Sequence, residues 1–263
     1  MKEKYLTDFN QLIELHNKTN AIHPALAKLY PVALADEEAL SIYDFDPQAD
    51  CYQFIKRCPL PMPIPLGVRA AFQIEAYGGR ISCVVTPDIF TTREGFITIL
   101  HEFVHCYQYE TCEQALKIGL DVAQKAHEVG DFMWEIDHPF PYNSTNFIEG
   151  YYYFLQALED GDSIKVLQAR HVLKTYLGVH DFEYMVWQEW KEGFARWVEN
   201  KIKYQLGVPE NTGGLSQPYS RVLFYAGGER YIRFLEGEDR SMVLDLPKLF
   251  HSMMRVNLNH SKQ

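Results

Sequence analysis

The sequence predicts an α+β fold that is mostly α, with a small antiparallel sheet ahead of a buried helix and a helical second half. Three observations predict it. The one strong strand pattern is a hairpin near residues 67–88, helix-like apolar spacing fills most of the chain beyond residue 91, and 47% of the residues are apolar. This composition favours an ordered core over disorder. We expect a single domain over residues 1–263, with three parts: a helical N-terminal part (1–66), the hairpin (67–90) and a helical part that carries the candidate site (91–263).

The elements follow in order along the chain. Residues 8–17 and 21–40 have helix-like apolar spacing, which is broken at Pro24 and Pro31. PLPMPIPLG (59–67) is an extended connector because its prolines lack backbone donors. Gly78 and Gly79 separate two β-branched and aromatic runs, which predicts a hairpin with a tight turn. Further helices are expected at 92–128, 146–158, 163–176, 182–206, 219–235 and 245–255.

Charge and hydropathy narrow the classes of partner. The formal net charge is −10 and the Lys and Arg residues form no cluster, so the sequence indicates no binding to nucleic acid. The longest apolar runs have five residues (Tyr151–Leu155 and Val222–Ala226), far below the ~20 of a membrane-spanning helix. The amphipathic start shows no secretory signal. We therefore expect a cytoplasmic protein that does not associate with membranes.

The cysteines are predicted to be free thiols with a packing role. They are odd in number and contain no CxxC pair, which disfavours both a disulfide framework and a thiolate metal site. They are Cys51, Cys58, Cys83, Cys106 and Cys112.

The segment after the hairpin, TTREGFITILHEFVHCYQYE (91–110), combines a helix start with an apolar helix. Thr91 and Glu94 match a capping box, so the helix is expected to begin at Thr92. Residues 96–107 are apolar nearly all round, which predicts a helix in the middle of the domain. Two histidines and a glutamate in such a helix require an explanation, because polar side chains without partners are costly to bury.

The pattern HEFVH explains these polar residues as part of a metal site. Residues four apart lie on one helix face, so His101 and His105 can direct two imidazoles at one tetrahedral ion. Glu102 lies beside them, where it can take a proton from a zinc-bound water. A shuffled sequence of this composition would contain about 0.03 matches to H-E-x-x-H. The sequence therefore predicts a zinc site with one Zn²⁺ per chain.

Two downstream segments offer a third ligand: Glu149 in NFIEGYYYF and Glu192 in QEWKEGFARWVEN. Asn146 and Glu149 stand three apart before an apolar run, a second capping-box pattern, which gives Glu149 a structural role. Glu192 lies on the helix face opposite Trp190. That position suits a ligand in a polar cleft or an ion pair with Arg196 on a solvated face. The residues alone leave both interpretations of Glu192 open.

HEFVH followed downstream by KEGFARWVE resembles the gluzincin zinc peptidases, above all the branch of aminopeptidases and leukotriene hydrolases, in which an NEGFA-type helix completes the HExxH site. The resemblance implies a zincin-like fold, with zinc held by His101, His105 and Glu192, Glu102 as general base, and a peptide or protein substrate. The segments are 87 residues apart, and the hairpin lacks the GxMEN segment that recognises a free amino terminus. Only the metal chemistry is therefore carried over, without aminopeptidase specificity.

The resemblance implies two further features. In these peptidases a tyrosine beside glycines, after the glutamate helix, stabilises the oxyanion. Tyr225 in FYAGG is the candidate, with Tyr219 and Tyr231 as alternatives. An edge strand ahead of the zinc helix holds the extended substrate by strand addition, and RISCVVT (80–86) is expected to be that strand.

Two other classes of function stay open at the level of sequence. The ExxH pattern of di-iron helical bundles occurs twice, and two more glutamates would complete such a site: Glu102, His105, Glu135, His138, Glu149 and Glu192. Alternatively, the zinc is structural and the chain is a binding module. Glu102 favours catalysis, because a buried carboxylate without a role is costly. A zinc metallopeptidase is therefore the prediction, with a di-iron oxidase or oxygenase and a non-catalytic zinc domain as alternatives.

Overall fold

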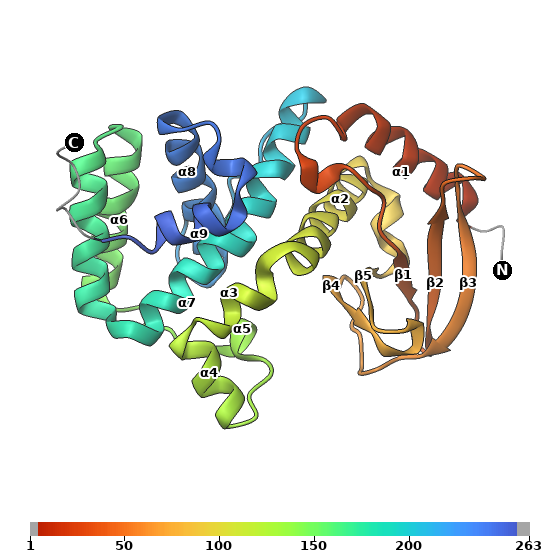
Figure 1. The fold of residues 1–263 in the computed structure, drawn as a ribbon, viewed down its shortest axis with the longest axis horizontal. Coiled ribbons are helices and arrows are strands. Elements are labelled where there is room, and N and C mark those ends of the chain that lie inside the picture. Colours follow the sequence, from red (N-terminus) through yellow and green to blue (C-terminus); the bar gives the residue numbers. More distant parts are fainter. Residues whose placement is uncertain (1–4, 257–263) are drawn as a thin grey trace. The chain divides into compact units, whose positions relative to one another are not determined.

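The computed structural model describes residues 5–256. These residues belong to two compact units. The first takes its residues from Met1–Thr111 and Val198–Glu210, and the second from Cys112–Trp197 and Asn211–Gln263. The predicted class, α+β and mostly α, is confirmed: the first unit holds a five-stranded sheet with helices, and the strands that the structure describes all belong to that sheet (Figure 1).

The sheet of the first unit has the strand order β3-β2-β1-β5-β4. β1 and β5 pair in parallel and the other neighbours are antiparallel. The strands are β1 (Val32–Ala35), β2 (Ala39–Asp46), β3 (Cys51–Pro59), β4 (Arg69–Ile74) and β5 (Arg80–Val85).

The predicted hairpin is confirmed as β4 and β5. Gly78 and Gly79 both have positive φ, 65° and 69°, a conformation that glycine adopts without steric cost. The expectation that 80–86 is an edge strand is wrong, because β5 is paired on both sides and β4 forms the edge. The parallel pairing of β5 with β1 joins segments about fifty residues apart, which no local pattern reveals.

The helix expected over 21–40 is also wrong beyond its first residues. This segment contains a short 3₁₀ turn, Pro24–Leu26, and then β1. All four residues of β1 are buried, so the alternation that marks a half-exposed strand is absent. β2 and β3 follow as an antiparallel pair and enlarge the sheet beyond the predicted hairpin.

Two helices, together with the end of α7 (Ser163–Gln205), complete the first unit. α1 (Leu6–Thr19), predicted over 8–17, packs against β3, and α2 (Arg93–Gln108) packs against β4 and β5. The cap of α2 is one residue later than predicted, because Thr92 accepts the bond from the Gly95 amide. A Cβ at Gly95 would lie 1.7 Å from the backbone oxygen of Ile89, so only glycine fits this close approach.

One face of the sheet carries a small apolar core. Ala33, Ile42 and Val84 are fully buried there, and Leu60 and Ile64 of the predicted connector pack against them. The connector is confirmed as an irregular segment between β3 and β4. Its prolines hold an extended path, and its apolar side chains cover the sheet.

The second unit is helical. The helix expected over 92–128 is divided into α2, a π-turn (Tyr109–Glu113), α3 and α4, and the break expected between 176 and 182 is a single kink at Gly178 (φ 72°) inside α7. No described helix combines the length and the apolar composition needed to cross a membrane. The helices are α3 (Gln114–Ile118), α4 (Asp121–Glu128), α5 (Trp134–Asp137), α6 (Thr145–Glu159), α7 (Ser163–Gln205), α8 (Val222–Glu238) and α9 (Leu246–Met253).

Three glycines let helices of the second unit approach closely. A Cβ at Gly228 in α8 would lie 2.1 Å from the backbone oxygen of Glu189 in α7, and a Cβ at Gly193 would meet the backbone of Gly228 at 2.7 Å. A Cβ at Gly227 would overlap the hydroxyl of Tyr151. Gly193 and Gly228 are therefore required by the packing of α7 on α8, and Gly227 by the packing of α6 on α8.

Candidate metal centre

His101 and His105 lie on the same face of α2, one turn apart, as the HEFVH spacing predicts. Their Nε2 atoms are 3.2 Å apart, and both side chains are buried. The imidazole planes are inclined by 74°, so the two rings approach edge to face. The structure thus brings the first two predicted ligands together.

Each histidine is held through its other ring nitrogen. His101 Nδ1 lies 3.0 Å from a carboxylate oxygen of Glu199, and His105 Nδ1 lies 2.9 Å from the side-chain oxygen of Gln108. Both partners accept hydrogen bonds, so both Nδ1 atoms carry the proton and donate. Both Nε2 atoms are then left with lone pairs directed at the same space.

This arrangement fits a metal ion. Two imidazole lone pairs 3.2 Å apart repel each other unless a cation lies between them. Zinc binds histidine nitrogen at ~2.0–2.1 Å in tetrahedral geometry, which places two such nitrogens about 3.3 Å apart. The carboxylate–histidine pair formed by Glu199 and His101 is also the support that ligating histidines usually have.

Glu199 itself is buried and ionised. Its second oxygen lies 3.1 Å from Lys203 Nζ, one turn later on α7. Burial raises the pKa of Glu199, but the hydrogen bond from His101 Nδ1 and the charge of Lys203 outweigh it and lower the pKa to about 2. The carboxylate is therefore a fixed negative charge behind His101.

Glu102 is buried beside the two histidines, with 5% of its surface exposed. Burial raises the pKa of Cys83 and Cys106 well above the usual range, and the negative charge of Glu102 raises both further. These thiols stay protonated and cannot act as thiolate ligands. All five cysteines are free and four are buried, as predicted for packing residues.

Glu192 lies on α7 in the second unit and is partly buried. The alternative prediction, that Glu192 lies on a solvated helix face with Arg196 and Glu199, is wrong for these two residues, because they are only 5% and 7% exposed. The apolar face is confirmed, since Trp187, Trp190 and the residues around them are also buried. The residues of α7 around Glu192 are therefore mostly buried.

The residue before Glu192 belongs to an ion-pair network. Lys191 Nζ lies 3.0 Å from Glu113 and 2.8 Å from Glu135, and Lys117 contacts the same two carboxylates. Burial lowers the pKa of Lys191, but the charges of Glu135 and Glu113 outweigh it and raise the pKa. Lys191 therefore stays charged within the second unit.

The residues of the predicted di-iron alternative have other partners. Glu135 accepts hydrogen bonds from Lys117, Lys191 and the indole nitrogen of Trp187. His138 Nε2 lies 2.7 Å from Asp181. Both side chains are engaged in structural contacts, and this arrangement does not favour a second metal site.

Glu149, the alternative third ligand, is exposed on α6. The predicted capping box at Asn146 is wrong: the N-cap is Ser144, and no side-chain hydrogen bond caps the helix. The residue therefore has neither the predicted structural role nor a buried position.

Tyr225 lies near the start of α8 and is partly buried. The Arg196 guanidinium stands 5.3 Å from the centre of its ring, and Arg196 follows Glu192 by one helical turn. The alternative Tyr231 is packed in the core beside Phe154 and Arg170, and burial raises its pKa to about 12. Of these two tyrosines, Tyr225 is the one placed near the α7 segment that carries Glu192.

Sequence reasoning missed the residues that orient the histidines: Glu199, Gln108 and Lys203. Gln108 follows His105 by three residues on the same helix, which is a usable local signal. Glu199 follows Glu192 by two turns, so a helical projection places both on one face of α7. Its pairing with His101 spans 98 residues and is visible only in three dimensions.

Comparison with known proteins adds no family: no family model, curated protein or solved structure matches this chain.

Proposed function

We propose that this chain is a zinc-dependent peptidase of the gluzincin kind, with zinc held by His101, His105 and Glu192. The observation that carries the proposal is the pair of buried imidazoles whose Nε2 atoms face each other at 3.2 Å while both Nδ1 atoms are occupied. Two nitrogens and one carboxylate with an open fourth position form a usual catalytic zinc set.

The continuity of α7 supports Glu192 as the third ligand. Glu199 on this helix bonds His101, and Glu192 precedes Glu199 by seven residues within the same unbroken helical stretch after Gly178. Seven residues turn an α-helix to within about 20° of the starting direction and advance it by about 10 Å. Glu192 therefore projects from the same face of α7 as the carboxylate that orients His101.

The side chains have distinct roles in the proposed hydrolysis. Bound zinc would supply Lewis acidity toward water and the substrate carbonyl. Glu102, buried next to His101, would take the proton from the attacking water and pass it to the leaving amine. Glu199 and Gln108 hold the imidazoles in orientation, and Tyr225 would donate a hydrogen bond to the developing oxyanion.

We also propose a cytoplasmic location. Its support is chemical: all five cysteines are free, and a reducing compartment keeps thiols in that state.

Metal content tests the site. The purified chain and three variants, Glu192→Ala, Glu149→Ala and Glu102→Gln, would be supplied with zinc, dialysed and analysed for metal. We expect one zinc in the parent chain and in Glu149→Ala, which is the matched control because Glu149 is exposed. Glu192→Ala should lose zinc. Glu102→Gln should keep zinc and lose hydrolysis of a mixed peptide library.

Each contrary outcome would refute one part of the proposed site: its third ligand, its metal, its general base or its catalytic role. Zinc lost from Glu149→Ala but kept by Glu192→Ala would move the third ligand to α6. Two irons per chain would favour the helical-bundle oxidase. Full zinc with unchanged hydrolysis in Glu102→Gln would refute the general base, and zinc without any hydrolysis would leave a non-catalytic zinc domain.

A further inference from the structure

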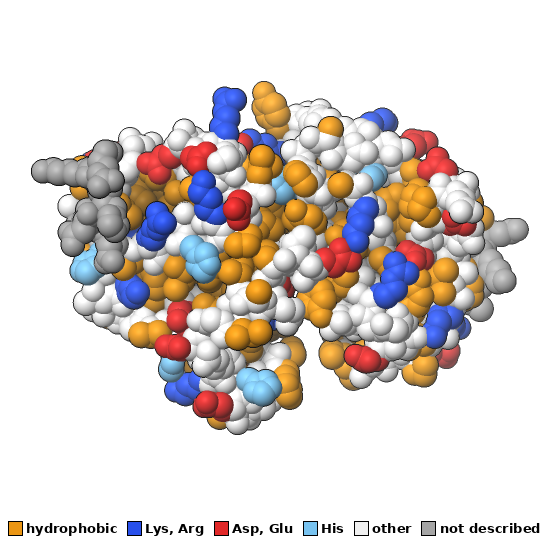
Figure 2. Space-filling view, viewed as in Figure 1, with side chains coloured by type: hydrophobic (Ala, Val, Ile, Leu, Met, Phe, Trp, Pro, Cys, Tyr) orange, Lys and Arg blue, Asp and Glu red, His pale blue; other side chains and the backbone are white. Residues whose placement is uncertain are grey.

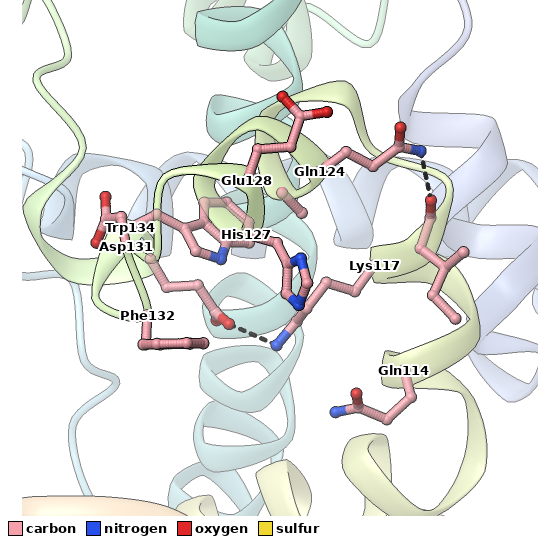
Figure 3. Close-up of a pocket in the computed structure, with 11 residues that line it drawn as sticks. Gln114, Lys117, Gln124, His127, Glu128, Asp131, Phe132 and Trp134 are labelled. Atoms are coloured by element: carbon pink, nitrogen blue, oxygen red, sulfur yellow. Dashed lines mark hydrogen bonds and ion pairs between the residues drawn. The ribbon is translucent and has the colours of Figure 1, made fainter.

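The second unit contains a cavity of about 650 Å³, here called the α3–α5 pocket. Its walls come from three short consecutive helices and the turns between them, a stretch of about twenty residues (Figure 3). Its lining combines apolar groups with charged groups, among them Ile118, Phe132, Lys117, Glu128, Asp131 and Glu135.

Apolar side chains around this pocket are unusually exposed. Phe132 is 81% exposed and Ile118 is 73% exposed, and Val129 and Ile136 beside them are 73% and 49% exposed. Figure 2 shows apolar, acidic and histidine side chains over α4 and α5, together with a Lys or Arg side chain. Apolar groups that cluster at the surface around a cavity, outside the core, mark a binding surface.

The charges at the pocket are unbalanced. Lys117 at its base is neutralised, because its Nζ lies 3.1 Å from Glu113 and 2.7 Å from Glu135. Glu128 and Asp131 are exposed and form no ion pair within residues 5–256. Two uncompensated carboxylates beside apolar walls favour a ligand that carries a positive charge next to an apolar group.

The pocket is joined to the segment that carries Glu192. One oxygen of Glu135 accepts from Lys117 at the base of the pocket, and the other accepts from Trp187 and Lys191 on α7. Lys191 directly precedes Glu192. A ligand in the pocket would therefore lie against the network that fixes this part of α7.

We propose that the α3–α5 pocket is a substrate subsite for a large apolar side chain with a basic residue next to it in the same peptide. The inference rests on the proposed peptidase function and names its substrate class. Phe132 and Ile118 form the apolar wall, and Glu128 and Asp131 attract the basic residue. The exposed apolar side chains then contact substrate.

Binding, measured apart from hydrolysis, tests the subsite. The full chain carrying Glu102→Gln would be titrated calorimetrically with a blocked hexapeptide that has a central phenylalanine flanked by two lysines, and with its twin that has two glutamates. We expect the lysine peptide to bind at least tenfold more tightly at 50 mM salt. The difference should shrink at 300 mM salt, because surface charges are screened.

Variants then locate the binding. Glu128→Lys with Asp131→Asn should weaken the lysine peptide about tenfold. Both changes suit the fold, because a cation is favourable at the end of α4 and asparagine can still accept the Met133 amide. Glu149→Lys with Asp160→Asn makes the same charge change on α6 and at its C-cap, and should leave affinity unchanged. Phe132→Ser should weaken both peptides.

Equal affinity for the two peptides, or equal weakening by the α6 control, would overturn the subsite. So would binding that Phe132→Ser leaves unchanged. Because the titration uses the Glu102→Gln chain, absent hydrolysis in the parent protein would refute the peptidase without altering this readout. Tight binding of a free alkylammonium ion in place of the peptide would assign the pocket to a small cation and overturn the peptide subsite.

Discussion

Replacing Glu199 by glutamine is expected to weaken zinc binding about 30-fold. The substitution keeps the shape of the side chain and removes the charge that accepts from His101 Nδ1 at 3.0 Å. A hydrogen bond to a charged group is worth about 1.5–3 kcal/mol, and ~2 kcal/mol corresponds to about 30-fold in Kd. The same range holds for outer partners of ligating histidines, whose loss costs ~10–100-fold in metal affinity.

A competition assay against a chromophoric chelator at pH 7.5 measures this affinity, alongside thermal unfolding without metal. Lys203→Met is the matched control, because it removes the ion pair of Glu199 with Lys203 and leaves the bond to His101 in place. If the carboxylate orients His101, Glu199→Gln should reduce zinc affinity far more than Lys203→Met. Equal zinc affinity in the parent chain and Glu199→Gln would refute the reasoning. Equal losses in both variants would show that Glu199 acts only through stability.

Two further predictions concern the second unit. Gly228→Ala should lower stability by more than ~3 kcal/mol, because its Cβ would lie 2.1 Å from the backbone oxygen of Glu189. Gly237→Ala on the same helix meets nothing within 4 Å and should be neutral or stabilising by ~0.5–1 kcal/mol. Thermal unfolding compares the two variants, and equal melting temperatures would contradict the close approach of Gly228 to α7. Burial raises the pKa of Glu135, but the charges of Lys191 and Lys117 outweigh it and lower the pKa to about 2 from an ordinary 4.5. The ionised Glu135 therefore contributes roughly 3 kcal/mol to the free energy of unfolding above pH 4.5, and this contribution is lost between pH 4.5 and 2. In urea unfolding, Glu135→Gln should therefore be much less stable than the parent chain at pH 7 and nearly as stable near pH 2. A difference in stability that does not depend on pH would contradict the lowered pKa of Glu135.

The parts of the fold that the sequence predicts are those with a local cause. The hairpin follows from Gly78 and Gly79, and the pairing of His101 with His105 follows from the helical repeat. The sequence does not predict β1, because a strand buried on both faces lacks alternation and its Ala- and Leu-rich segment resembles helix. Which strand forms the sheet edge depends on the pairing of β1 with β5, which is not local.

The candidate site divides in the same way. Two ligands and the general base lie within five residues, so spacing alone predicts them. The residues alone do not decide between Glu149 and Glu192 as the third ligand, because both lie in similar glutamate–glycine segments. Burial separates the two glutamates in the structure: Glu149 is exposed, whereas Glu192 is partly buried among buried residues of α7. Burial depends on the whole chain, so the sequence pattern does not reveal it.

The buried thiol of Cys106 can report local opening of the first unit. Cys106 follows His105 directly, is fully buried, and has a pKa raised by burial and by the charge of Glu102. A thiol reagent reaches it only when α2 separates from the sheet, so its labelling rate counts these openings. An ion bridging His101 and His105 would oppose such openings. The rate at which one cysteine is labelled would then report occupancy of the neighbouring site without any substrate being known.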